Sequence, residues 1–233
     1  MGRLRRDIKA LASKLLPDSE QLRYLSHLPK LEAWRRSRAR SAPLLPDRFA
    51  LYDHVNSAVL GGRPLTYLEF GVFRGESIRE WARLNRDPES RFFGFDTFTG
   101  LPDAWRGFKS GHEQGVFDVG GETPDIPDRR VSFIRGLFQD TLPAFLTRQP
   151  LGPPLVVHVD CDLYSGALYV LSRCNDVLTA GSVIVFDEFS SMLHEFRALE
   201  DYCAAFRRDY AVVGVVAKGP YFSYYPQVAI RLA

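Results

Sequence analysis

One short segment, residues 66–78, constrains the fold more than any other part of this 233-residue chain. An apolar run of β type ends at Glu69, and two glycines, Gly71 and Gly75, precede a stretch with helical character that begins at Ser77. A strand, a glycine turn and a helix in this order place backbone N–H groups and a helix N-terminus against a bound ligand. The spacing Gly-x-x-x-Gly differs from the Gly-x-Gly-x-x-Gly of dinucleotide-binding proteins. An acidic residue before the turn suits an amino group better than a pyrophosphate, so we expect S-adenosylmethionine as the ligand.

The next apolar run, residues 91–96, also ends in an acid, Asp96. A carboxylate at the tip of the second strand is placed to accept hydrogen bonds from ribose hydroxyls. Aspartate at such a position commonly caps the following turn instead. The upstream Glu69 and its glycine turn favour the ribose role.

From residue 66 onward, strand-like and helix-like segments alternate, which indicates a parallel sheet with helices on both faces. The expected strands are residues 66–70, 91–96, 131–135, 155–160, 182–187, 211–217 and 227–232. Residues 218–226 are too few for a crossover helix, so the last two strands must pair antiparallel. The sequence therefore predicts a Rossmann-like α/β fold with a mostly parallel seven-stranded sheet and an antiparallel last strand. This ending is typical of class I methyltransferases.

The residues before this region have a different character. Leu4, Ile8, Leu11 and Leu15 recur at helical spacing, and an arginine-rich helix is expected over residues 19–39. Residues 43–46 are interpreted as a linker, and residues 48–59 as a helix that leads into the core. We therefore expect a helical N-terminal arm and linker over residues 1–47 and a methyltransferase domain over 48–233. The arm is expected to pack on the body or on a second subunit, which would make a homo-oligomer.

Residues 104–128 are rich in glycine and proline and lack periodicity. A loop of this length inside a compact domain is usually functional, and we interpret it as a lid over the substrate. Trp105, Phe108, Phe117 and Tyr164 are candidates for an acceptor pocket, although packing is the commoner role of such aromatic residues.

Composition excludes several classes of protein. A net charge of +2 gives no case for nucleic-acid binding. No apolar run approaches the roughly 20 residues of a membrane span, and the first residues lead into an amphipathic pattern rather than a signal peptide. The three cysteines lack metal-ligand spacing, so reduced thiols and a cytoplasmic location are expected.

Two pairs of acids follow two neighbouring strands. Asp160 and Asp162 end one buried run, and Asp187 and Glu188 end the next. The ends of parallel strands meet at one edge of a sheet, where Glu69 and Asp96 also belong. Crowded carboxylates repel one another unless a cation joins them, and Mg²⁺ is the hard ion that prefers oxygen ligands. Capping of the following helices is the alternative.

Histidine gives a weaker signal. His158 lies inside the strand before Asp160, where a satisfied core histidine is the commoner identity and a catalytic base the lesser alternative. His112, in the expected lid, is by default a solvated loop residue.

Four segments together resemble the macrocin O-methyltransferase family. They are residues 69–77, the Phe-Asp-Thr-Phe-Thr-Gly-Leu-Pro of 95–102, the Asp-Cys-Asp-Leu-Tyr of 160–164 and the Phe-Asp-Glu of 186–188; residues 136–143 are also similar. The resemblance runs from about residue 66 to the C-terminus. That family acts on the sugars of macrolide and aminocoumarin antibiotics, which implies a role in natural-product biosynthesis.

The resemblance also assigns roles to residues. Asp162, Asp187 and Glu188 would bind Mg²⁺, and Asp160 would be the general base. The family commonly has a second aspartate where this chain has Glu188, so the ion position would shift or Glu188 would lie outside its ligand shell. The expected cofactor-binding residues are Glu69, Gly71, Val72, Gly75, Ser77, Asp96, Thr97, Leu137 and Phe138.

The resulting hypothesis is a Mg²⁺-dependent O-methyltransferase that uses S-adenosylmethionine and acts on a vicinal diol of a small-molecule acceptor. A metal that chelates two hydroxyls orients them and lowers the pKa of the reacting one. Two rivals remain. A metal-dependent glycosyltransferase would use the Asp-x-Asp pair for a nucleotide-sugar diphosphate, and a non-catalytic scaffold would bind the cofactor alone.

Overall fold

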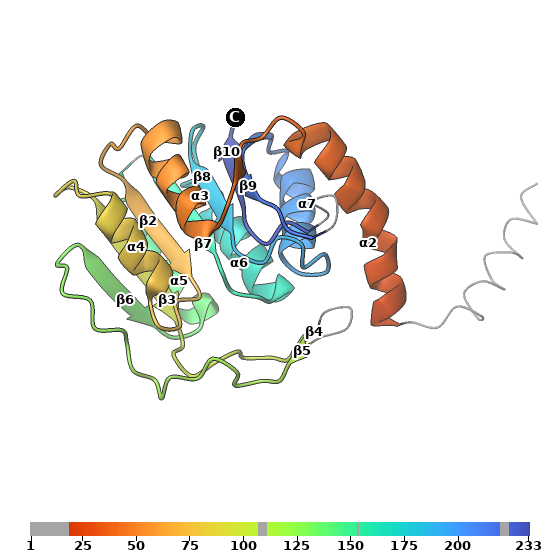
Figure 1. Ribbon diagram of the computed structural model, residues 1–233. Coiled ribbons are helices and arrows are strands. Elements are labelled where there is room, and N and C mark those ends of the chain that lie inside the picture. The colour runs from red at the N-terminus through yellow and green to blue at the C-terminus, as the bar shows by residue number, and fades with distance from the viewer. Residues whose placement is uncertain (1–18, 107–110, 153, 220–223) are drawn as a thin grey trace, which may run out of the picture.

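Eight strands form the central sheet of the computed structural model, which describes residues 19–106, 111–152, 154–219 and 224–233 (Figure 1). The strand order is β1-β9-β10-β8-β7-β2-β3-β6. The strands are β1 (Leu44–Leu45), β2 (Thr66–Phe70), β3 (Arg91–Asp96), β6 (Val131–Arg135), β7 (Leu155–Val159), β8 (Val183–Phe186), β9 (Tyr210–Val216) and β10 (Val228–Leu232). All seven predicted strands are present.

Strand pairing confirms the predicted topology. β2 pairs in parallel with both β3 and β7, β3 with β6, and β7 with β8. β10 is antiparallel to both β8 and β9, as the short connection required. The eighth strand is the difference: Leu44 and Leu45, interpreted as linker, pair in parallel with Val215 and Val216. An exposed sheet edge offers unpaired backbone groups, and a two-residue partner leaves no periodicity to recognise in the sequence.

Helices cover both faces of the sheet. They are α2 (Glu20–Trp34), α3 (Arg48–His54), α4 (Glu76–Leu84), α5 (Phe138–Arg148), α6 (Tyr164–Cys174) and α7 (Glu195–Phe206); single π-helical segments, Arg35–Ala39 and Val55–Val59, continue α2 and α3. Successive strand residues point to opposite faces. Tyr67 and Val156 pack with residues of α3 and α4, whereas Leu68 and Val157 pack with residues of α5, α6 and α7. The prediction of helices on both faces is confirmed.

The described part of the N-terminal arm packs on the body at one end. Ser19 caps α2 by accepting a hydrogen bond from the Leu22 N–H (3.2 Å). At the other end, Trp34 is buried against Phe189, with ring centroids 4.6 Å apart, and its Nε1 donates to the Tyr210 hydroxyl (2.9 Å). The helix expected over residues 4–15 lies outside the described residues. No helix in the described part of the chain is long and apolar enough to cross a membrane.

The glycine- and proline-rich segment 104–128 contains a short antiparallel hairpin, β4 (Trp105–Arg106) and β5 (Gly111–His112). In Figure 1 the described parts of this segment pass beneath the carboxyl end of β2.

The strand order reverses between β2 and β7, because the chain runs outward through β3 and β6 before it returns to β7 and β8. In open α/β sheets, ligands bind at such a reversal, outside the carboxyl ends of the strands. The two strand ends meet closely here: a Cβ added at Gly71, after β2, would lie 1.7 Å from the backbone oxygen of Asp160, after β7. Only glycine fits this approach.

Candidate active site

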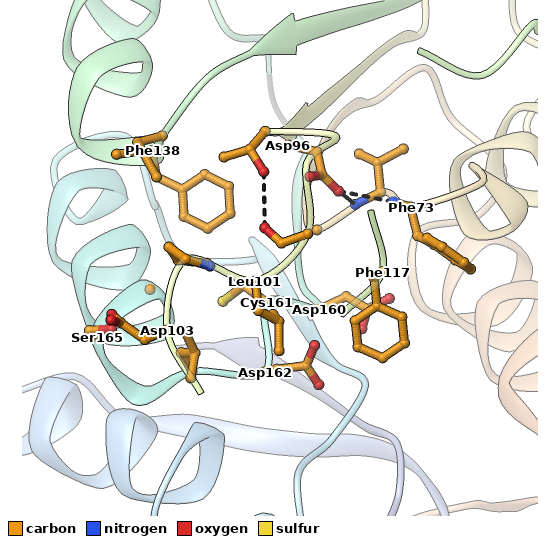
Figure 2. Close-up of a pocket in the computed structure, with 18 of the residues that line it drawn as sticks. Phe73, Asp96, Leu101, Asp103, Phe117, Phe138, Asp160, Cys161, Asp162 and Ser165 are labelled. Atoms are coloured by element: carbon orange, nitrogen blue, oxygen red, sulfur yellow. Dashed lines mark hydrogen bonds between the residues drawn. The ribbon is translucent and has the colours of Figure 1, made fainter. Parts of the chain in front are cut away.

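A cavity of about 450 Å³ opens at the reversal point (Figure 2). The loops that follow β2, β3, β6, β7 and β8 all contribute to its wall. Ten of the predicted site residues line it: Gly71, Val72, Asp96, Thr97, Leu137, Phe138, Asp160, Asp162, Asp187 and Glu188. The structure therefore brings together residues that lie more than one hundred positions apart in the sequence.

Asp96 organises the glycine loop. One carboxylate oxygen accepts the backbone N–H groups of Val72 (2.7 Å) and Phe73 (2.9 Å), drawn in Figure 2, and the other accepts that of Phe98 (2.8 Å). Asp96 therefore caps the turn, which was the alternative to ribose binding, and it also lines the cavity. Asp96 holds the loop against which a ligand would bind.

Three of the predicted cofactor-binding residues do not line the cavity: Glu69, Gly75 and Ser77. Glu69 is buried and accepts a hydrogen bond from the Tyr67 hydroxyl. The buried Ser77 hydroxyl lies 3.3 Å from that of Tyr52. Gly75 has a φ of 72° at the start of α4, a left-handed conformation that favours glycine.

The four acids of the two strand ends face the same cavity, as predicted from the sequence. The reason for Asp162 differs from the prediction, because β7 ends at Val159 and Asp162 has a left-handed φ of 58°. A turn, rather than an extended strand with alternating side chains, directs its carboxylate into the cavity. Aspartate tolerates this conformation better than most residues.

A tighter group of potential ligand atoms forms deeper in the wall. Atoms of His158, Asp160 and Asp187 lie within 4.8 Å of one another. Only Asp187 belongs both to this group and to the predicted metal ligands. The other two predicted ligands, Asp162 and Glu188, line the cavity. His158, expected to be a satisfied core residue, is fully buried between Glu69 (3.7 Å from Nδ1) and Asp187 (3.8 Å from Nε2).

Burial and the charge of Asp187 raise the pKa of three acids that line the cavity, Asp160, Asp162 and Glu188. Burial, reinforced by the charge of Asp187, raises the pKa of Asp160 well above its ordinary value and that of Asp162 to about 6. Burial and the same neighbour raise the pKa of Glu188 to about 7. This pattern is expected where like charges share a poorly hydrated site.

Asp187 is the exception. Burial alone would raise its pKa, but His158 and Arg48 lower it below the ordinary value. For His158 itself, burial would lower the pKa, and the Asp187 and Glu69 carboxylates instead raise it to about 10. The charged form is therefore favoured at Asp187 and disfavoured by burial at Asp160.

The residues present fit a divalent cation. Carboxylate oxygens converge from two adjacent strand ends, which is the donor set that Mg²⁺ prefers. A cation held by Asp162, Asp187 and Glu188 would favour the charged forms that burial and mutual repulsion disfavour at Asp160, Asp162 and Glu188.

The sequence analysis did not identify two residues of the site, Arg48 and Tyr52. Arg48, the first residue of α3, lines the cavity and pairs with Glu76 at 2.5 Å. Tyr52 donates to Asp187 (3.3 Å) from the same helix. Both residues reach the site only because α3 packs near the strand ends in the folded protein. No local sequence pattern therefore marks either of them.

The aromatic candidates for the acceptor pocket have different positions. Phe117 lines the cavity. Tyr164 donates to Asp201 (2.8 Å) on α7, and Trp105 stacks near His194, with ring centroids 5.7 Å apart. Phe108 lies outside the described residues.

Comparisons with known proteins agree with this geometry. A family model described as methyltransferase domain matches residues 68–189, more than half of the chain. No curated protein matches the chain by sequence. Several solved structures share the fold.

The calicheamicin methyltransferase CalS11 is 22% identical, with a TM-score of 0.58 and coverage of 93% of this chain and 94% of that one; its apo structure is described as that of a TDP-rhamnose 3′-O-methyltransferase. The O-methyltransferase NovP is 21% identical, with a TM-score of 0.59 and coverage of 79% and 78%. An O-methyltransferase from Bacillus cereus in complex with SAH is 14% identical, with a TM-score of 0.51 and coverage of 97% and 96%. These likenesses confirm the Rossmann-like fold.

Proposed function

Because the chain belongs to the methyltransferase-domain family that its residues 68–189 match, we propose that it is an S-adenosylmethionine-dependent, Mg²⁺-dependent O-methyltransferase that acts on a vicinal diol. The prediction of a methyltransferase enzyme is confirmed by this membership. One observation carries the finer proposal: the glycine loop with Asp96 and the four acids of β7 and β8 line a single cavity. A methyl donor and a metal-bound acceptor would therefore meet there.

The structural neighbours support the proposed cofactor and acceptor class. SAH is bound to the Bacillus cereus O-methyltransferase, and the apo CalS11 structure is described as that of a TDP-rhamnose 3′-O-methyltransferase. Together with the resemblance to macrocin O-methyltransferases, they favour a sugar or another natural product as acceptor. A role in natural-product biosynthesis is part of the same proposal.

The reaction needs alignment and one proton transfer. When bound, the cofactor would supply an activated methyl group, and the ion would lower the pKa of the hydroxyl that it binds. The glycine loop and Asp96 would hold the methyl donor, and Asp162, Asp187 and Glu188 would hold the ion and, through it, the acceptor. Asp160 would accept the proton of the acceptor hydroxyl, because a bound cation would favour the ionised form of this carboxyl.

Substitution of one metal ligand tests the proposal. Asp162→Ala should reduce methyl transfer at least about a hundredfold, because both substrate orientation and charge stabilisation are lost, while S-adenosylhomocysteine binding changes little. The matched control is Asp176→Ala, because Asp176 is exposed and lies outside the cavity. Wild-type activity should also be lost in excess chelator and return with Mg²⁺. Full activity of Asp162→Ala, or activity unaffected by chelator, would contradict the metal assignment.

The rivals are tested by binding. Isothermal titration with S-adenosylhomocysteine and with a uridine diphosphate sugar separates the methyltransferase from the glycosyltransferase. Tight cofactor binding without transfer to any diol in a broad panel would favour the scaffold.

Two further expectations belong to the proposal. A cytoplasmic location is supported by the three free cysteines, since Cys161 and Cys174 are buried and none forms a disulfide in the described chain. A homo-oligomer through the arm is supported by Leu22, Leu25 and Leu28, which leave 39–45% of their surface exposed along α2. Sedimentation analysis of the whole protein tests the latter.

A further inference from the structure

Two phenylalanines from different loops meet at the cavity. Phe73 follows β2 in the glycine loop, and Phe117 belongs to the segment 104–128; both line the cavity (Figure 2). Their ring centroids are 5.4 Å apart at an interplanar angle of 71°. We propose that the exposed surface of this edge-to-face pair, called the aromatic clamp below, packs against a ring in the acceptor, so that the enzyme selects cyclic over open-chain diols. The inference deepens the proposed function and rests on it for the methyl-transfer readout.

Backbone conformation separates these two residues from ordinary packing. Phe73 has a φ of 50° and Phe117 a φ of 73°, in the left-handed region that bulky residues avoid. Phe98 is also left-handed at 59°, but its side chain is fully buried, and that burial offsets the strain. Phe73 and Phe117 keep 37% and 39% of their surface exposed. Strain without compensating burial concentrates at ligand-binding sites.

Further rings extend the clamp along the segment. His112 lies 5.5 Å from Phe117, and Trp105 lies 5.4 Å from His112, measured between ring centroids. Trp105 in turn stacks near His194, just before α7, at 5.7 Å and 25°. Phe117 is therefore part of a row of rings that runs from Phe73 in the glycine loop to His194 before α7.

The combination of groups defines the ligand chemistry. Carboxylates and a metal would bind hydroxyl oxygens, whereas the faces and edges of aromatic rings pack against carbon and C–H groups. A pyranose or catechol ring with two adjacent hydroxyls presents both kinds of surface at once. An open-chain diol presents the hydroxyls alone, so it gains nothing from the clamp.

The test replaces one ring and compares acceptors. Phe117→Ala is assayed with labelled S-adenosylmethionine and Mg²⁺ on catechol, p-nitrophenyl α-L-rhamnopyranoside and glycerol. We expect KM for the two cyclic acceptors to rise about 3- to 10-fold, the range for loss of one aromatic contact, with a smaller change in kcat. The rate with glycerol and the S-adenosylhomocysteine affinity should stay the same. Phe117→Tyr should restore KM.

Phe206→Ala is the matched control, because Phe206 is 41% exposed at the end of α7 and lies outside the cavity. Phe117→Leu and a thermal melt of each variant detect a folding defect. Unchanged KM for the cyclic acceptors, an equal loss with glycerol, or weaker S-adenosylhomocysteine binding in Phe117→Ala would overturn the clamp.

Failure of the proposed function gives a different result. If the wild-type enzyme methylates none of these probes, the rhamnoside and catechol are titrated into its S-adenosylhomocysteine complex with Mg²⁺. Binding that weakens in Phe117→Ala but not in Phe206→Ala would support the clamp, although the methyl transfer had failed. Absence of binding to the wild type would overturn the clamp as well.

Discussion

Gly71 lies where the ends of β2 and β7 meet, and its replacement by alanine tests the geometry of the whole site. The new Cβ would lie 1.7 Å from the Asp160 backbone oxygen, where ordinary contact begins at 3.4 Å. The two strand ends would have to separate by more than about 1 Å, and a misplacement of this size can cost about a hundredfold in rate. The loop that carries Val72 and the turn that carries Asp160 would both move.

Backbone strain must be distinguished from this steric effect. Gly71 has a φ of 93°, so alanine there also incurs the left-handed penalty of roughly 1–2 kcal/mol. Gly61 provides the control, since its φ is 71° and a Cβ there would contact nothing within 4 Å. Gly61→Ala should therefore lose stability alone, about 2–4 °C in Tm for each kcal/mol in a chain of this size.

The assay is methyl transfer, together with S-adenosylhomocysteine titration and thermal unfolding of both variants. Gly71→Ala should lose at least about a hundredfold in kcat/KM and bind S-adenosylhomocysteine more weakly, whereas Gly61→Ala should match the wild type in both. The reasoning is refuted if the two variants retain equal activity, or if Gly71→Ala is impaired only in stability.

Two further predictions concern other carboxylates. Asp96→Ala removes the acceptor for the N–H groups of Val72, Phe73 and Phe98, so the S-adenosylhomocysteine Kd should rise at least about tenfold, the effect of losing hydrogen bonds to a charged group; calorimetry measures it, and a Kd within twofold of wild type would rule out the role. Asp128 accepts from Arg130 (2.7 Å), which lowers the pKa of that carboxyl. Its contribution to stability is present above the unfolded pKa near 3.8 and is lost as pH falls through the lowered folded pKa. The stability gap between wild type and Asp128→Asn in urea melts should thus be constant near pH 6 and narrow as the pH falls below the unfolded pKa of 3.8; a gap that does not change with pH would contradict this origin.

The predictable part of the site follows from two local rules. Strand ends of a parallel sheet share one edge, so Asp96, Asp160 and Asp187 could be placed together from the order of strands alone. The glycine turn after β2 predicted a close approach of the backbone to a bound ligand; in the structure, Gly71 also allows a close approach to the backbone of Asp160, which was not predicted. Both rules depend on chain order and residue type, which are present in the sequence.

The unpredicted part depends on contacts between distant segments. His158 is central to the acidic group because β7 lies between β2 and β8, which places Glu69 and Asp187 on either side of it. Arg48 and Tyr52 reach the site because α3 packs across the sheet, and the direction of Asp162 comes from a left-handed turn. None of these contacts has a sequence period.

The sequence by itself determined which segments become strands, that the last pair is antiparallel, and which loops bear acids and glycines. Hydrophobic periodicity and turn chemistry act between neighbours in the chain, so they can be recognised without a structure. Tertiary structure alone decided the eighth strand, the partners of His158 and the meeting of Phe73 with Phe117. Those contacts join residues that only the packed sheet brings within a few ångströms of one another.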